Sequence, residues 1–264
     1  MRILITNDDG IGAPGLEVLA EIAATVAGEG GEVWTVAPAF EQSGVGHCIN
    51  YVRPSMVSQI GDRRFAVEGS PADCVLAGLG DLVKEPVDLI LSGVNRGNNA
   101  GENAVYSGTI GAAMEGALQG LPAIALSQFY GPDNVDLDDP FEAARVHGAA
   151  LVQKLLEDAP WGGDAYKLFY NVNFPARPAR MVRGFAAVAQ GYRGDGRMGV
   201  HPQTAPSGRR YLWISGSAQG ERTAPGTDVR ANVDGWVSVT PMRCDLTDHA
   251  ALDDLRALMP DYTG

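Results

Sequence analysis

MRILITNDDGIGAPGL, residues 1–16 of the 264-residue chain, contains a strand, a sharp turn and the start of a helix. The apolar run Arg2–Thr6 predicts a short buried strand, and two adjacent aspartates, Asp8 and Asp9, follow its end. The glycines of Gly10–Gly15 permit a tight turn into the next element. A buried strand that leads directly into a helix is typical of the first unit of a parallel α/β sheet.

The same alternation continues through the first two-thirds of the chain. Short, uniformly apolar strands alternate with helical patterns, which predicts a doubly wound, mostly parallel sheet covered by helices on both faces. We expect strands at Arg2–Thr6, Glu32–Ala37, Val87–Leu91 and Ala123–Leu126, helices at Leu16–Val26, Ser70–Leu79, Ile110–Leu118 and Phe141–Leu156, and a β-hairpin from Cys48–Val52 and Arg64–Val67.

The composition changes after about Phe174, where proline and glycine become frequent and strand patterns dominate. Further strands are expected at Met181–Ala189, Arg210–Ser215 and Trp236–Thr240, and a last helix at His249–Leu258. We therefore expect a core over residues 1–175 and a β-rich extension with a C-terminal helix over 176–264. The extension carries the apolar residues Leu212, Trp213, Ile214, Trp236, Val237 and Val239. Because a lone hairpin is marginal in water, we expect a second copy of the chain to cover it by exchange; the alternative is that the extension folds back on its own core.

Charge and cysteine content narrow the classes of partner. The net charge of −12 disfavours long nucleic acids and anionic membranes. The three cysteines are far apart and form no C-x-x-C motif, which predicts a reducing compartment. No basic segment followed by an apolar one precedes the first strand, and no apolar run reaches membrane-spanning length. We expect a soluble cytoplasmic protein with no membrane partner.

The glycines at positions 10, 12 and 15 match the G-x-G-x-x-G pattern of dinucleotide-binding proteins. Two observations disfavour a nicotinamide or flavin cofactor. Asp8 and Asp9 would place negative charge beside the pyrophosphate, and the strand Glu32–Ala37 ends without the acid that binds ribose. We expect these glycines to shape the turn instead.

The two aspartates point to a metal. In an open parallel sheet, ligands bind beyond the carboxyl ends of the strands, where Asp8 and Asp9 stand. One of them could cap a helix, but the repulsion between two adjacent carboxylates favours a hard divalent cation. Neutral oxygens come from the loops Gln42–Gly44 and Ser92–Gly101, and the helix start after Tyr106 offers a phosphate site. Together these groups indicate metal-assisted hydrolysis of a phosphate ester.

Seven stretches then resemble a known family. They are ITNDDGIGAPGL, PAFEQSGVG, GSPADCV, LSGVNRGNNAG, YSGTIGAAMEG, PGTDVRANVDGWVSVTP and CDLTD. In this order, and over almost the whole chain, they resemble the survival protein E (SurE) family of 5′/3′-nucleotidases. The resemblance implies divalent-metal ligands at Asp8, Asp9, Ser43 and Asn95, catalytic roles for Asp8, Asp9 and Asn95, and phosphate binding by Ser107, Gly108, Thr109 and Asn99.

The resemblance also implies a Rossmann-like core, one divalent cation per subunit, with Mg²⁺ or Mn²⁺ expected, and a homodimer or homotetramer with an exchanged C-terminal element. The implied substrates are nucleoside 5′- and 3′-monophosphates and short-chain polyphosphate. Trp236 and Met242 stand where the family usually has tyrosine and leucine, in a C-terminal strand away from the expected site.

Two other functions remain open at this point. A phosphotransferase of the haloacid dehalogenase type also places a nucleophilic aspartate after its first strand, but its second acid stands two residues on, whereas Asp8 and Asp9 are adjacent and Gly10 follows them. A nucleotide-binding regulatory module would bind nucleotide and release no phosphate. No histidine stands in the matched loops as a general acid.

Overall fold

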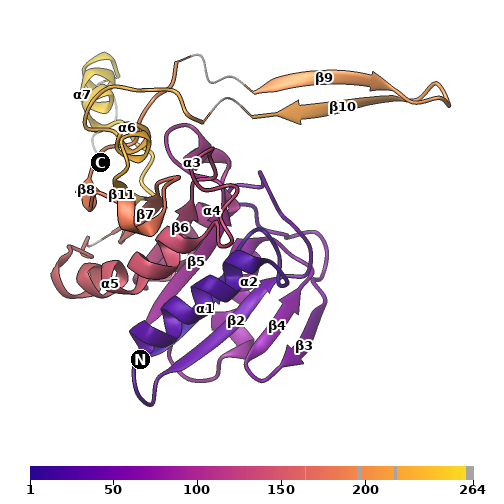
Figure 1. Cartoon of the computed structure of the whole chain (residues 1–264), viewed down its shortest axis with the longest axis vertical. Coiled ribbons are helices and arrows are strands. Elements are labelled where there is room, and N and C mark those ends of the chain that lie inside the picture. Colours follow the sequence, from indigo (N-terminus) through magenta and orange to yellow (C-terminus); the bar gives the residue numbers. More distant parts are fainter. Residues whose placement is uncertain (164, 195–197, 217–218, 260–264) are drawn as a thin grey trace.

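The computed structural model describes residues 1–163, 165–194, 198–216 and 219–259 (Figure 1). Within them, nine strands form one sheet in the order β3-β4-β2-β1-β5-β6-β7-β11-β8, and β9 and β10 form a separate hairpin. The parallel core of the sheet comprises β1 (Arg2–Thr6), β2 (Glu32–Pro38), β4 (Arg64–Val67), β5 (Leu89–Arg96), β6 (Ala123–Gln128) and β7 (Leu168–Phe174). The doubly wound α/β class expected from the sequence is confirmed.

Helices cover both faces of this sheet, because alternate residues of each strand point to opposite sides. Ile3 and Ile5 of β1 pack in one core with helices α1 (Pro14–Ala27) and α5 (Glu142–Asp158). Leu4 packs in the other core. That second core includes residues of the helices α2 (Pro71–Ala77) and α4 (Gly108–Leu118). The first strand is therefore buried on both sides and fixes the position of the loop that follows it.

The C-terminal part extends this sheet and adds the hairpin. Strand β11 (Val237–Arg243) pairs antiparallel to β7, and β8 (Phe185–Ala187) pairs with β11. The boundary expected at residue 175 therefore coincides with the end of β7, while the sheet continues beyond it. Strands β9 (Gly199–Thr204) and β10 (Arg210–Ser215) project away from the body of the molecule (Figure 1). The remaining helices are α3 (Asn103–Tyr106), α6 (Asp228–Val233) and α7 (His249–Leu258).

The expected first strand of the N-terminal hairpin is wrong. Cys48–Val52 forms no strand, and β4 pairs instead with β3 (Val57–Gly61). All five residues of β3 are exposed at the edge of the sheet, so no alternating apolar pattern marks them. The sequence interpretation also omitted β7, whose buried Asn171 and Asn173 interrupt its apolar run, and it omitted β9 and α6.

Two of the valines expected in the exposed extension are buried instead. Val237 and Val239 lie in the main sheet with 0% and 7% of their surface exposed. Leu212, Trp213 and Ile214 of β10 are exposed, as expected. No helix within the described residues is both long enough and apolar enough to cross a membrane.

Candidate active site

The predicted site residues meet at the carboxyl edge of the sheet, where the loops after β1, β2 and β5 face the start of α4. Strands β1 and β5 run side by side, with Thr6 opposite Ser92, so the chain segments that follow them emerge together. Asp8, Ser43, Asn95 and Ser107 line one cavity of about 200 Å³. Asp9 lines an adjoining cavity of about 480 Å³ that also contains Ser43.

Asp8 is held by the start of α4. Its carboxylate is 4% exposed, and Thr109 Oγ1 donates a hydrogen bond of 2.7 Å to its Oδ1. Gly108 permits this approach, because a Cβ there would stand 2.9 Å from the Cβ of Asp8. Burial raises the pKa of Asp8 from 3.8 to about 6, and the charge of Asp9 adds to the rise. Within the described residues, no cationic side chain pairs with Asp8 to stabilise its charge.

The other three predicted ligands are also oriented by hydrogen bonds. Asp9 Oδ2 accepts from the backbone N–H of Arg96 at 3.0 Å, and burial raises the pKa of Asp9. Asn95 Nδ2 donates to the carbonyl of Gly97 at 2.8 Å. Ser43 Oγ donates to Glu41 Oε1 at 2.7 Å. Glu41 was not among the residues expected from the sequence, since its role is visible only through this contact.

These four side chains fit a hard divalent cation. The hydrogen bonds found in the described part of the chain occupy one oxygen of each aspartate and the amide nitrogen of Asn95. Asp8 Oδ2, Asp9 Oδ1 and Asn95 Oδ1 therefore stay available, and Ser43 keeps its oxygen lone pairs while it donates. Among the described residues, no cluster of three or more histidine, cysteine, aspartate or glutamate side chains could hold a metal ion. Two carboxylates with neutral oxygens suit Mg²⁺ or Mn²⁺ better than softer metals.

The side chains expected to bind phosphate divide into two groups. Ser107 caps α4, because its Oγ accepts from the N–H of Ile110 at 3.1 Å, and its own hydroxyl hydrogen remains available to a ligand. The hydroxyl of Thr109 is fully buried and already bonded to Asp8. The backbone N–H of Thr109 also stabilises the charge of Asp8, so the hydroxyl and the N–H of this residue both serve that carboxylate.

The asparagines of the loop after β5 supply further donors. Asn99 lines the 200 Å³ cavity and uses Nδ2 to donate to Ser127 Oγ at 2.8 Å, which leaves a second amide hydrogen. Asn98, which the sequence interpretation did not single out, lines the same cavity and is only 2% exposed. Neither of its amide atoms has a partner within the described residues. Such buried amides are usually satisfied, so this side chain indicates a ligand of the cavity.

Contacts from the C-terminal part hold this loop in place. Asp228 accepts from the N–H of Gly101 at 3.0 Å and from the N–H of Gly191 at 2.7 Å. The side chain of Arg193 is fully buried and donates to the carbonyl of Ala100 at 3.0 Å. The segments that lead to the projecting hairpin therefore brace the asparagine loop. These long-range contacts have no local signature in the sequence.

The fold and the site together define a class, the doubly wound α/β proteins that carry a pair of adjacent carboxylates at the carboxyl end of the first strand. Within this class, the chain belongs to the survival protein SurE family, whose model matches residues 3–196. The resemblance noted from the sequence is thereby confirmed.

The similarity to curated proteins and to a solved structure covers nearly the whole chain. Proteins named 5′-nucleotidase SurE from Ruegeria pomeroyi and from Cereibacter sphaeroides are each 62% identical over 260 residues, which is 98% of this chain and 100% of each relative. The crystal structure of the SurE protein from Aquifex aeolicus superposes with a TM-score of 0.79 at 33% identity, covering 98% of this chain and 100% of that one.

Proposed function

We propose that this protein is a divalent-metal-dependent phosphomonoesterase that releases phosphate from nucleoside 5′- and 3′-monophosphates. The observation that carries the proposal is the convergence of Asp8, Asn95, Asn98 and Ser107 on one small cavity. The names of the curated relatives support nucleotides as substrates of this chain. A lone carboxylate pair would repel phosphate, so the cation must bind before or with the substrate.

Two sets of residues at this cavity would hold the cation and the phosphoryl group. Asp8, Asp9, Ser43 and Asn95 would hold the cation. When bound there, a divalent cation can lower the pKa of water and offset the charge on phosphoryl oxygens. Ser107, the N-terminal N–H groups of α4 and the amide of Asn98 donate to the remaining phosphoryl oxygens. The donors therefore fix the phosphorus in place for attack by water.

The described residues around the 200 Å³ cavity provide no obvious acid for the leaving oxygen. No histidine lines the 200 Å³ cavity among the described residues, and Asp8 is its only carboxylate. Asp8 would be deprotonated by the bound cation, so it would have no proton to give. We propose that water protonates the leaving alkoxide of the ribose.

A phosphate-release assay with nucleoside monophosphates and a series of divalent metals tests this function. We expect release with Mg²⁺ or Mn²⁺ and no phosphorylated protein. A phospho-aspartate trapped on Asp8 would show the covalent mechanism of the haloacid dehalogenase type instead. Tight nucleotide binding without release at any metal would show a regulatory module.

Replacing Asn95 or Ser43 with alanine is expected to weaken metal binding rather than abolish it. Water can replace a neutral oxygen ligand, whereas the charged ligands remain in place. At limiting Mn²⁺ the activity should fall by about 10–100-fold, and excess Mn²⁺ should restore most of it. Activity measured against metal concentration checks this. Normal metal affinity with activity that excess metal cannot rescue would contradict the assignment and indicate direct substrate contact.

Replacing Ser107 with alanine is expected to raise the inhibition constant of inorganic phosphate by about tenfold, since one donor to a charged group is lost. Loss of the helix cap should cost a further ~1 kcal/mol of stability. Thr109→Val serves as the matched variant, because its hydroxyl bonds Asp8 and its loss should weaken metal affinity instead. If Thr109→Val alone impaired phosphate inhibition, the two roles would be reversed.

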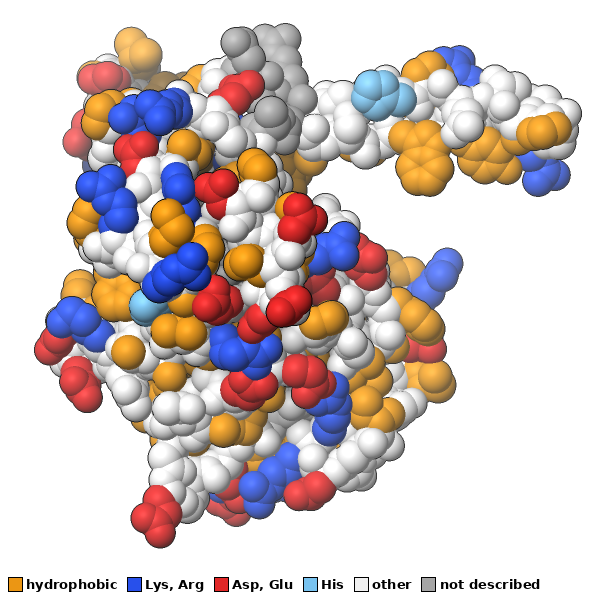
Figure 2. Space-filling view, viewed as in Figure 1, with side chains coloured by type: hydrophobic (Ala, Val, Ile, Leu, Met, Phe, Trp, Pro, Cys, Tyr) orange, Lys and Arg blue, Asp and Glu red, His pale blue; other side chains and the backbone are white. Residues whose placement is uncertain are grey.

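We also propose that the chain assembles as a homodimer or homotetramer through its C-terminal part. Strands β9 and β10 project without covering elements, and hydrophobic side chains line the hairpin (Figure 2). Trp213 and Ile214 are 65% and 72% exposed. Exposed apolar surface of this kind usually marks an interface, and exchange about a two-fold axis would cover it.

Introducing charge into this hairpin is expected to dissociate the oligomer. Ile214→Asp should reduce the mass measured by light scattering at micromolar concentration, because a buried unpaired charge is costly. Thr204→Asp, on the other hairpin strand, is the matched control. A wild-type monomer at this concentration with full activity, or equal dissociation by both variants, would contradict the proposed interface.

A further inference from the structure

A second cavity adjoins the site at the cation ligands Asp9 and Ser43. It has a volume of about 480 Å³ and shares Ser43 and Arg96 with the 200 Å³ cavity. Asp9 lies on its wall. Pockets for small-molecule ligands have volumes of about 300–1,000 Å³, so the 200 Å³ cavity suits a phosphoryl group alone and the 480 Å³ cavity suits the rest of a substrate.

Aromatic side chains and a glycine-rich turn line this larger cavity. Tyr130 lines it with its ring in edge contact with Phe141, at 5.5 Å between centroids and 70° between planes. Phe40 lines it from the loop after β2 and is 67% exposed. The turn packs tightly below, since a Cβ on Gly15 would stand 1.9 Å from the carbonyl of Val94. The G-x-G-x-x-G pattern therefore builds the floor of this cavity.

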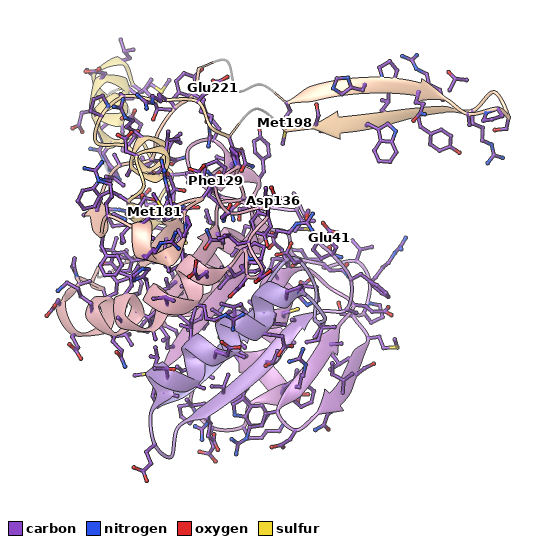
Figure 3. All side chains as sticks on the ribbon, in the orientation of Figure 1. Glu41, Phe129, Asp136, Met181, Met198 and Glu221 are labelled. Atoms are coloured by element: carbon purple, nitrogen blue, oxygen red, sulfur yellow. The ribbon has the colours of Figure 1, made fainter. Side chains whose placement is uncertain are left out.

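The charges in the larger cavity disfavour a second anion. Asp9 and Glu41 contribute two negative charges and Arg96 one positive charge. Figure 3 labels Glu41 among the loops of the core, on the side nearer the projecting hairpin. The charge of a bound cation would already be offset by the phosphoryl group in the 200 Å³ cavity. A second phosphate in the larger cavity would therefore face a wall of net negative charge. A neutral group with an aromatic ring and hydroxyls meets no such penalty.

We propose that this cavity binds the nucleoside of the substrate, with the base against Phe40 and Tyr130 and the ribose hydroxyls facing the Glu41 carboxylate. This inference rests on the proposed function and specifies its substrate class. It makes nucleoside monophosphates better substrates than polyphosphate chains, which carry charge where the base would lie. Phe40 and Tyr130 are then specificity-determining residues.

A third cavity, of about 990 Å³, is the other possible place for the nucleoside. It reaches Ser107 from the side of β11 and contains Leu246, but none of Asp8, Asp9, Ser43 or Asn95 lines it. It shares only Ser107 with the 200 Å³ cavity. The 480 Å³ cavity shares both Ser43 and Arg96 with the 200 Å³ cavity and also contains Asp9, so we place the nucleoside there.

The test compares two substrates that differ only in the base. KM is measured for adenosine 5′-monophosphate and for ribose 5-phosphate with the wild type, Phe40→Ala, Phe40→Tyr and the control Leu246→Ala, which alters the 990 Å³ cavity at an 89% exposed side chain. Phe40→Ala should raise the KM for adenosine 5′-monophosphate, divided by the KM for ribose 5-phosphate, about tenfold. This is the effect of losing one contact between the base and an aromatic side chain. Phe40→Tyr should keep the ratio near the wild-type value.

One further readout is independent of turnover, and a second tests the charge of the cavity. Saturation-transfer NMR with adenosine and metal-free protein should show binding to the wild type and to Leu246→Ala, and weaker binding to Phe40→Ala. Glu41→Gln should lower the KM for tripolyphosphate relative to that for adenosine 5′-monophosphate, because it removes one repelling charge.

The outcomes separate this inference from the proposed function. An unchanged KM ratio in Phe40→Ala, or a raised ratio in Leu246→Ala, would overturn the nucleoside assignment while phosphatase activity stands. If the wild type hydrolysed neither ester, the proposed function would fail, and the adenosine-binding experiment would still decide where a nucleoside binds.

Discussion

Phosphate release by the Asp8→Asn variant is expected to fall by about 10²–10³-fold, the scale on which loss of one preorganised electrostatic group acts. The amide keeps the hydrogen bond from Thr109 and the shape of the carboxylate, so the fold should persist. The change removes one negative ligand from a site whose cation affinity depends on ligand charge. Asp9→Asn should behave alike.

Steady-state phosphate release at limiting metal measures this effect, and circular dichroism checks the fold. Asp81→Asn provides the matched control, because Asp81 is an exposed carboxylate whose ion pair with Lys84 lies on the surface. Near-wild-type turnover of Asp8→Asn or Asp9→Asn at low metal concentration would show that these carboxylates hold no catalytic cation.

The same Asp8→Asn substitution is expected to stabilise the metal-free protein above about pH 6. Burial raises the pKa of Asp8 from 3.8 to about 6, so the folded state binds this proton more tightly than the unfolded state does. Stability from this group is therefore present at low pH and is lost as pH rises from about 4 to about 6. The difference in pKa corresponds to about 3 kcal/mol in the free energy of unfolding.

Urea unfolding of wild type and Asp8→Asn at several pH values, with chelator present, measures this difference. The variant should match the wild type near pH 4 and exceed it by about 3 kcal/mol near pH 7. Saturating Mg²⁺ or Mn²⁺ should then stabilise the wild type and leave the variant unchanged, since only a bound ligand adds stability. A variant no more stable than the wild type at neutral pH would contradict the predicted desolvation of Asp8.

Much of the parallel core could be predicted from the sequence because its strands are buried on both faces. The apolar runs of β1, β2, β5 and β6 carry a strong signal, and each was placed within two residues of its observed start, although β5 continues five residues beyond its predicted end. Edge and polar strands carry no such signal. The all-exposed β3 was misplaced, and β7 was missed because Asn171 and Asn173 serve the interior of the fold.

Asn173 shows why part of the site could not be predicted. Its side chain accepts from the N–H of Asn99 at 2.7 Å and so supports the asparagine loop from a strand 74 positions away. The glycine and asparagine content of that loop indicated a ligand-binding turn, but its supporting contacts depend on tertiary structure. The hydroxyl of Thr109 is a similar case. Its position at the start of a helix suggested that it binds phosphate, whereas in the structure it donates a hydrogen bond to Asp8.

Phosphate release from a nucleoside 5′-monophosphate by chelator-treated protein, before and after a divalent cation is restored, tests the central claim most directly. The structure of the site predicts negligible release without metal, recovery with Mg²⁺ or Mn²⁺, and no recovery in Asp8→Asn. Release that continues in the chelated protein, or that Mg²⁺ or Mn²⁺ restores equally in wild type and Asp8→Asn, would contradict it.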